Sequence, residues 1–153
     1  MSTQIDPRGQ RFTAAVNLAG FTVALLAAPS PLTEVLLAVL GVAFAFGAFV
    51  GPQHTPWALL FKNLVRPRLG PPRELEDAAP PRFAAAVGLA FTGLALVGYV
   101  SGATLLGAIA TGFALAAAFL NAVFGFCLGC EVYLLARRLA PAHKESAGNP
   151  VAH

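Results

Sequence analysis

The stretch from Phe83 to Phe126 carries no charged residue, and this most limits how the chain can fold. A helix crosses the hydrocarbon core of a bilayer in about 20 residues, so this stretch is long enough for two crossings. A break is expected at Ser101-Gly102. Two further uncharged segments, Phe12–Ala28 and Val35–Gln53, precede it. These apolar runs are continuous rather than alternating, which favours helices over a transmembrane barrel.

The composition agrees with a polytopic, all-α membrane protein. Hydrophobic residues make up 57% of the chain and charged residues 11%, with a mean hydropathy of +0.70. Soluble domains have roughly 25% charged residues, and a short soluble chain has too much surface for its volume to hide so many apolar side chains. The sequence therefore predicts four transmembrane helices, at about Phe12–Ala28, Leu32–Val50, Phe83–Val100 and Ala103–Phe124.

The chain also repeats itself at an offset of 71 positions (82 − 11). Arg11-Phe12-Thr13-Ala14-Ala15-Val16 matches Arg82-Phe83-Ala84-Ala85-Ala86-Val87, and the same offset pairs Asp6 with Asp77 and Arg66 with Arg137. Two spans in each unit give both units the same orientation, which is a parallel repeat. We therefore expect one membrane domain over 1–153, made of repeat 1 (about 6–68), a connector (about 69–76), repeat 2 (about 77–139) and a disordered tail (140–153), with short interfacial helices.

The basic residues predict the orientation. All ten Lys and Arg lie at the N-terminus, between the second and third spans, or after the fourth span. The turns Pro29-Ser30-Pro31 and Ser101-Gly102 carry none. The positive-inside rule then places both termini and the central loop in the cytoplasm. The net charge of +3 does not indicate nucleic acid, since no basic stripe with interleaved aromatic residues is present; the lipid bilayer is the expected partner.

Polar residues near the spans have structural interpretations. Asn17 and Asn121 are expected to make interhelical hydrogen bonds. After the second span, Thr55 and Pro56 are typical of an N-cap and first helical residue. The helix that they begin should lie in the membrane interface, with Trp57 at the level of the lipid headgroups.

Both cysteines of the chain lie just after the last span, in Phe126-Cys127-Leu128-Gly129-Cys130. The offset of 71 pairs Cys127 with Pro56, so Cys127 should begin a short helix. A thiol in the first turn of a helix meets unpaired N–H groups, which lower its pKa. Cys130 follows one turn later on the same face. We expect Cys127 to be a nucleophile and Cys130 to resolve a mixed disulfide, although Glu131 opposes a low thiol pKa.

Other roles for the pair stay open at this point. Two small thiols can simply pack at a helix junction. Structural zinc takes four ligands, and His54 is the one histidine expected near Cys127 and Cys130; two pairs in a homodimer could also complete a zinc site. The sequence specifies no cofactor. A quinone held between the helices, or zinc, is an open alternative.

Several motifs identify a resemblance that covers about residues 6–139. They are Asp6-Pro7-Arg8, Leu64-Val65-Arg66-Pro67-Arg68-Leu69-Gly70, Pro80-Pro81-Arg82-Phe83 and Phe124-Gly125-Phe126-Cys127-Leu128-Gly129-Cys130-Glu131. The chain resembles the DUF4395 family, integral membrane proteins of uncharacterised function found mainly in actinobacteria. The resemblance implies a multi-pass protein of the bacterial plasma membrane. Family members resemble small four-helix membrane proteins linked to thioredoxins and sulfurtransferases, which implies a thioredoxin-like or sulfurtransferase-like partner.

The function that we expect is a membrane-embedded thiol–disulfide or persulfide relay, hence a thiol–disulfide oxidoreductase. Two alternatives belong to other classes. One is a transporter or channel for a small anion or sulfur compound, and the other is an assembly or metal-binding module without turnover. Hydride and phosphoryl transfer find no support, since the chain has neither a G-x-G-x-x-G fingerprint nor a P-loop.

Overall fold

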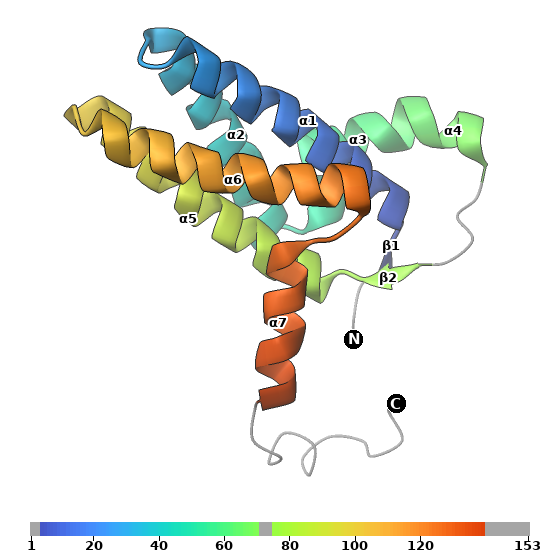
Figure 1. Cartoon of the computed structure of the whole chain (residues 1–153). Helices are drawn as coiled ribbons and strands as arrows, with labels where there is room; N and C mark the ends of the chain where they lie inside the picture. The colour runs from blue at the N-terminus through green and yellow to red at the C-terminus, as the bar shows by residue number, and fades with distance from the viewer. Residues whose placement is uncertain (1–3, 71–74, 140–153) are drawn as a thin grey trace.

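Four long helices run side by side in a bundle (Figure 1). The structure is a computed structural model that describes residues 4–70 and 75–139. The helices are α1 (Pro7–Ala27), α2 (Pro31–Phe49), α5 (Ala79–Ser101) and α6 (Thr104–Phe124). Their positions agree with the four predicted segments to within a few residues, apart from earlier starts of α1 and α5. Arg73, Lys144 and the predicted tail lie outside the described residues.

The helix ends follow from local chemistry. The Asp6 carboxylate accepts the N–H of Arg8 at the start of α1, and the Ser30 hydroxyl accepts the N–H of Thr33 at the start of α2. A proline occupies the first turn of both helices, where its missing N–H costs nothing. Gly102 and Gly125 end α5 and α6 with φ angles of 90° and 69°, a conformation in which glycine avoids a steric penalty.

Three of these helices, α2, α5 and α6, are long and apolar enough to cross a membrane, judged within the described residues. Helix α1 is as long as α6, with 21 residues each, but its first two turns carry Arg8 and Arg11. Large apolar side chains face outward along the bundle; Leu26 is 82% exposed and Leu105 75% exposed. A continuous apolar exterior is unfavourable in water, so the protein is a membrane protein.

The core of the bundle lies toward the two helix turns. Helix α1 packs chiefly on α6, and α2 packs chiefly on α5. The buried residues of this core come from all four helices and are mostly small or aliphatic: Phe21, Ala24, Leu37, Leu40, Ala95, Tyr99, Ala110 and Ala114. Helices α5 and α6 approach each other closely next to the turn that joins them. A Cβ at Gly98 would lie 2.7 Å from the backbone nitrogen of Gly107, so this contact depends on the glycine.

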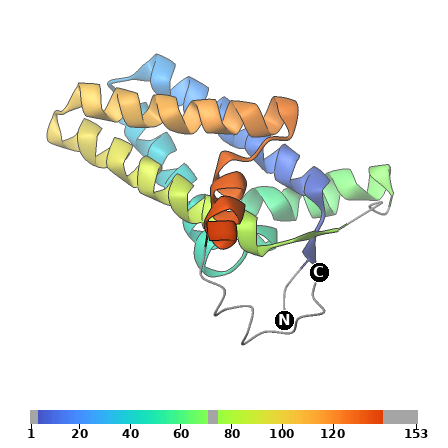
Figure 2. The ribbon, with the colours of Figure 1, turned by 60° about the horizontal axis from the view of Figure 1, so that its bottom comes forward.

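A short β-ribbon joins the starts of α1 and α5 at the opposite end of the bundle (Figures 1 and 2). Strand β1 (Gln4–Ile5) pairs antiparallel with β2 (Glu76–Asp77), and Ile5 lies opposite Glu76. The expectation of a purely helical chain missed this ribbon. Two-residue strands are too short to show the alternating pattern by which strands are predicted.

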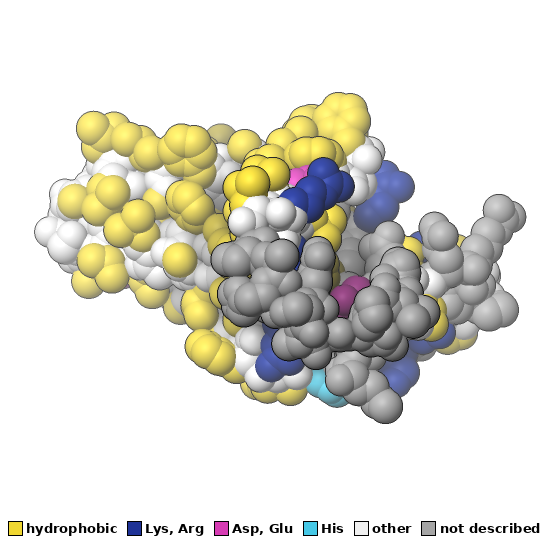
Figure 3. Space-filling model, turned by 90° about the horizontal axis from the view of Figure 1, so that it is seen from below, with side chains coloured by type: hydrophobic (Ala, Val, Ile, Leu, Met, Phe, Trp, Pro, Cys, Tyr) yellow, Lys and Arg dark blue, Asp and Glu magenta, His cyan; other side chains and the backbone are white. Residues whose placement is uncertain are grey.

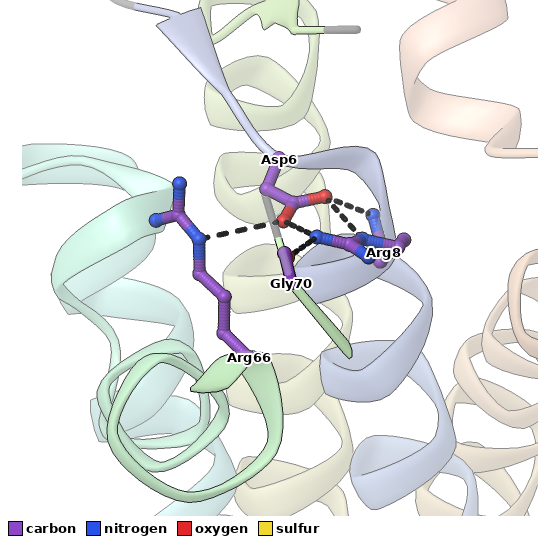
Figure 4. A network of polar contacts seen from close by, with 4 residues as sticks. All are labelled: Asp6, Arg8, Arg66 and Gly70. Atoms are coloured by element: carbon purple, nitrogen blue, oxygen red, sulfur yellow. Dashed lines mark hydrogen bonds and ion pairs between the residues drawn. The ribbon is translucent and has the colours of Figure 1, made fainter. Parts of the chain in front are cut away.

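Asp6 ties the start of α1 to the segment after α2. Its carboxylate pairs with Arg8 at 2.9 Å and lies 3.9 Å from Arg66, while Arg8 also donates to the carbonyl of Gly70. Figure 4 shows Arg8 and Arg66 on opposite sides of the carboxylate. Burial raises the pKa of Asp6, but the hydrogen bonds from Arg8 and the charges of both arginines lower it more, so the pKa lies below its ordinary value.

Short helices follow α2 and α6 at this end. After α2 come the 3-10 turn η1 (Pro52–His54), α3 (Pro56–Leu60), the π-helical turn η2 (Phe61–Val65) and α4 (Arg66–Leu69). The predicted cap at Thr55 and start at Pro56 are confirmed, but the π-helical turn interrupts the helix. After α6 comes α7 (Leu128–Leu139), which projects from the bundle (Figures 1 and 2).

The cations of the described chain gather at this same end. The cations lie at the starts of α1 and α5, in η2 and α4, and at the end of α7: Arg8, Arg11, Lys62, Arg66, Arg68, Arg82, Arg137 and Arg138. Figure 3 shows Lys and Arg near α7 and the short helices, whereas the bundle beyond is apolar on the visible face. The end that carries all the described cations is the charged end of the molecule. The other end is formed by two turns without a cation, near which Glu34 lies in the first turn of α2.

Candidate functional site

Cys127 is the N-cap of α7. The chain leaves α6 at Gly125, and the N–H of Phe126 returns to the carbonyl of Leu120 at 3.2 Å. Helix α7 begins at Leu128, so the expectation that Cys127 itself begins the helix is wrong by one residue. The helix begins one residue later because Cys127 is its cap: the sulfur of Cys127 accepts the N–H of Cys130 at 3.3 Å, as a cap side chain does.

The two thiols are in direct contact. The Cys130 thiol donates to Cys127 Sγ at 2.6 Å, and the Cys127 carbonyl accepts the N–H of Glu131 at 3.0 Å. Both cysteines are half-buried. A disulfide of about 2.05 Å would need the sulfur atoms to approach by only about half an ångström more. The two sulfur atoms are therefore close enough for a disulfide to need little movement of the backbone.

The surroundings favour a thiolate at Cys127. The hydrogen bond from the Cys130 thiol lowers the pKa of Cys127, and the backbone N–H groups of Cys130 and Gly129 act in the same direction. Burial and the carboxylate of Glu131 raise it, but the net pKa lies below its ordinary value of 9.0. The thiolate is the nucleophilic form, so the lowered pKa favours the reactive form of Cys127.

The first turn of α7 packs closely against α5. A Cβ at Gly129 would lie 2.5 Å from the Cβ of Ala84, so only glycine fits there. One turn further, the rings of Phe83 and Tyr133 meet with their centroids 5.7 Å apart. The start of α7, and with it both thiols, is thus held against the start of α5.

The side chain of Arg11 caps the C-terminal end of α6. This helix ends two residues before Phe126 and Cys127 begin the link to α7. Its guanidinium donates to the carbonyls of Ala122 and Val123 at 3.2 and 3.0 Å. A cation satisfies the unpaired carbonyls and the negative end of the helix dipole. Arg82 does the same at the end of α2, where it donates to the carbonyls of Ala48 and Phe49.

His54 does not join the cysteines. It ends η1 with an exposed side chain, and within 4–70 and 75–139 no three His, Cys, Asp or Glu side chains gather closely enough to hold a metal ion. The metal alternative with Cys127, Cys130 and His54 in one chain is therefore wrong for the described residues. The offset that predicted their proximity was misleading, because α6 ends later in its unit than α2 does.

A cavity of about 390 Å³ lies between the four long helices and the start of α7. Cys127 lines it, and so do the aromatic rings of Phe44, Phe91 and Phe113. Its other lining residues are mostly small, and none of them is charged in the part of the chain that the structure describes. The cavity occupies the half of the bundle that the core leaves open, next to the charged end.

Two buried polar atoms at this cavity have no hydrogen-bond partner in the described structure. They are Asn17 Oδ1 and Trp57 Nε1, and both residues line the cavity. Asn17 is only 6% exposed. The expected interhelical hydrogen bond of Asn17 Oδ1 is not formed, and the indole N–H of Trp57 is buried. Sequence analysis missed this site, although a polar residue within a span was a signal for it.

The fold and this site define an all-α membrane protein with a thiol pair at the N-terminus of a short helix and an apolar cavity beside it. The chain belongs to the DUF4395 family, described as a domain of unknown function, whose model matches residues 5–138. Searches of curated proteins and of solved structures found no match. Family membership confirms the resemblance seen in the sequence, and the function has to be argued from the site.

Proposed function

We propose that the protein is a membrane-embedded thiol–disulfide or persulfide relay. One observation carries this proposal: Cys127 Sγ, the cap of α7, receives both the N–H and the thiol of Cys130. Two hydrogen bonds to one sulfur stabilise the thiolate more than the thiol. A packing role alone does not require two sulfur atoms in contact at a helix start.

The relay consists of two exchange steps. The Cys127 thiolate attacks a disulfide of a partner protein, so that a mixed disulfide forms and one partner thiolate leaves. Cys130 then attacks the Cys127 sulfur; the Cys127–Cys130 disulfide forms and the second partner thiolate leaves. In the persulfide form, Cys127 takes the outer sulfur of a partner persulfide and the partner thiolate leaves. A thioredoxin-like or sulfurtransferase-like protein is the proposed partner.

We also propose that α1 is a fourth span and that the chain is a tandem repeat. The β-ribbon supports the repeat, because Ile5 pairs with Glu76, its own counterpart at an offset of 71. Arg11 and Arg82, which share the same offset, support it too, since each caps the last turn of a helix in the other unit. With four spans, the charged end faces the cytoplasm by the positive-inside rule.

The cavity does not favour the transport alternative. Polar or charged residues usually line an ion path, and the described lining carries no charge. An assembly module without turnover would not need a cap that lowers a thiol pKa. We therefore retain the relay as the proposed function.

Trapping a covalent intermediate tests the relay. Cys130→Ser leaves Cys127 without its resolving thiol, so we expect a mixed disulfide with a cellular protein that is visible on a non-reducing gel and lost on reduction. Cys127→Ser is the matched control and should trap far less. If neither variant gives an adduct that depends on Cys127, the relay is wrong.

A further inference from the structure

The cavity beside Cys127 has the features of a ligand site. Ligand pockets are typically about 300–1,000 Å³ and mostly apolar, with a few polar groups that orient the ligand. The cavity here measures about 390 Å³. Asn17 and Trp57 line it, and each has a buried polar atom, Oδ1 and Nε1, without a partner among the described residues. A buried polar group that is left unsatisfied is unfavourable, so both atoms call for a partner.

These two groups specify a ligand with both an acceptor and a donor. The indole N–H of Trp57 can only donate, so it needs an acceptor. Asn17 presents an amide that can accept through its oxygen, so it can take a hydrogen bond from a hydroxyl. A lipid acyl chain would satisfy neither group. An ionised ligand is disfavoured because no charged side chain is available in the described lining to offset its desolvation.

The aromatic side chains at the cavity favour a flat ring. Phe91 and Phe113 contact each other with centroids 6.1 Å apart, and Phe44 stacks on Phe21 at the same separation. The edges and faces of such rings pack well against another planar ring. Cys127 lies at the wall of the same cavity, so the ligand would lie beside the reactive sulfur.

We propose that the cavity binds a lipid-soluble quinone, which oxidises the Cys127–Cys130 dithiol. A quinone is neutral in its oxidised and reduced forms, has carbonyl oxygens to accept from Trp57, and as a quinol has hydroxyls to donate to Asn17. The proposal rests on the relay function and runs its two exchange steps in the reverse sense, so that electrons pass from a partner dithiol through the cysteine pair to the quinone.

The reaction balances in atoms and electrons. Both S–H bonds break and one S–S bond forms between Cys127 and Cys130, which releases two electrons and two protons. The quinone ring takes up the two electrons, and its two oxygens take the two protons, so one quinol forms for each disulfide. A partner dithiol then reduces the disulfide and restores the starting state.

Trp57 is the only tryptophan of the chain, so its fluorescence reports binding without any chemistry. The full-length protein in lipid nanodiscs would be titrated with decylubiquinone and with menadione, in a Cys127→Ser, Cys130→Ser background. We expect saturable quenching at about one quinone per chain. The titration would be repeated with the reduced forms, decylubiquinol and menadiol, because only a quinol hydroxyl can donate to Asn17 Oδ1. With the quinols, Asn17→Leu should raise the concentration for half quenching about tenfold, as loss of one buried hydrogen bond predicts.

Thr22→Val is the matched control on the same helix. The Thr22 hydroxyl donates to the carbonyl of Leu18, and the residue does not line the cavity, so its variant should bind as the parent does. Quenching without saturation, or equal quenching by the quinols in Asn17→Leu and Thr22→Val, reflects partition into lipid or a water-filled cavity and overturns the proposal.

Turnover gives a second readout in the protein with both cysteines. The reduced protein should convert about one quinone to quinol per chain and lose both thiols, whereas Cys127→Ser should convert none. Trp57→Phe should raise the quinone concentration for half-maximal turnover about tenfold. A Cys127-dependent protein adduct without quinone reduction overturns the quinone site alone. Quinone reduction without any adduct overturns the protein relay and leaves the quinone site standing.

Discussion

Cys127 has the same place at the start of α7 that Thr55 has at the start of α3. Thr55 Oγ1 accepts the N–H of Ala58 at 3.1 Å, and Cys127 Sγ accepts the N–H of Cys130 at 3.3 Å, three residues on in each case. The carbonyls of the two residues also accept the N–H four residues later, both at 3.0 Å. At the start of α7 a thiol thus takes the capping position that a hydroxyl has at the start of α3. The second thiol, Cys130, takes the position of Ala58, whose side chain has no reactive group.

The cap predicts how substitutions at Cys127 act on α7. Cys127→Thr should preserve the helix, because its hydroxyl can cap as that of Thr55 does, but should abolish thiol exchange. Cys127→Ala should destabilise the first turn by about 1 kcal/mol. Hydrogen exchange at the amides of Cys130 and Glu131 checks this: we expect exchange to be several times faster in the Ala variant only. Equal exchange in both variants would contradict the capping role.

The lowered pKa of Cys127 predicts the pH dependence of its alkylation. The rate with iodoacetamide should rise with pH through a midpoint below 9.0, because only the thiolate reacts. Cys130→Ala removes the largest lowering contribution and should shift the midpoint up. Glu131→Gln removes a raising contribution and should shift it down. A midpoint that neither substitution moves would show that these neighbours do not set the thiol pKa.

The same pKa links stability to pH. Since folding lowers the pKa of the Cys127 thiol, its contribution to stability is present above the unfolded pKa and is lost as pH falls through the folded value. The wild-type protein should therefore gain stability relative to Cys127→Thr as pH rises toward 9. Thermal unfolding in detergent at pH 6 and pH 9 measures the difference; a difference of the opposite sign would contradict the shift.

The close contact of Gly129 with Ala84 predicts a strong steric effect of any side chain at position 129. Gly129→Ala would push its Cβ to 2.5 Å from the Cβ of Ala84, so it should displace α7 at a cost of about 1–3 kcal/mol and alter thiol reactivity. Ala84→Gly in the same chain should restore little of the loss, because the added Cβ would also lie 2.6 Å from the Cα of Ala84. Gly112→Ala is the control, because nothing lies within 4 Å of the added Cβ. Thermal unfolding and alkylation of Cys127 measure both effects.

Asp6 predicts a loss of stability in acid. Because the folded pKa of Asp6 lies below the ordinary 3.8, its contribution is full above that value and is lost as pH falls through the folded pKa. Asp6→Ala should cost about 1 kcal/mol at neutral pH through loss of the cap. Asp77→Ala is the comparison, since the Asp77 carboxylate accepts the N–H of Ala79 just before α5 but has no ion pair among the described residues; it should cost less.

The proposed orientation predicts which positions react from outside the cell. Ser101→Cys, in a chain with Cys127 and Cys130 replaced by serine, should react with a membrane-impermeant maleimide in intact cells. The native cysteines should react only after lysis. Labelling of Cys127 in intact cells would reverse the orientation.

The sequence by itself determined where the long helices lie, which end is charged and which residues form the thiol pair. These properties are local: a continuous apolar run predicts a helix in lipid whatever it packs against, and the two cysteines are three residues apart in any fold. The cap at Thr55 was also local, and it was predicted correctly.

Only the tertiary structure decided what surrounds the thiols. The guanidinium of Arg11 holds carbonyls more than 100 residues away in the chain, and Asn17 and Trp57 meet Cys127 only at the wall of a cavity between helices. Such contacts depend on helix rotation and on where each helix ends, which a periodic pattern does not specify to within one residue. For that reason the sequence placed Cys127 one residue too far into α7, brought His54 to the wrong place and left the cavity unseen.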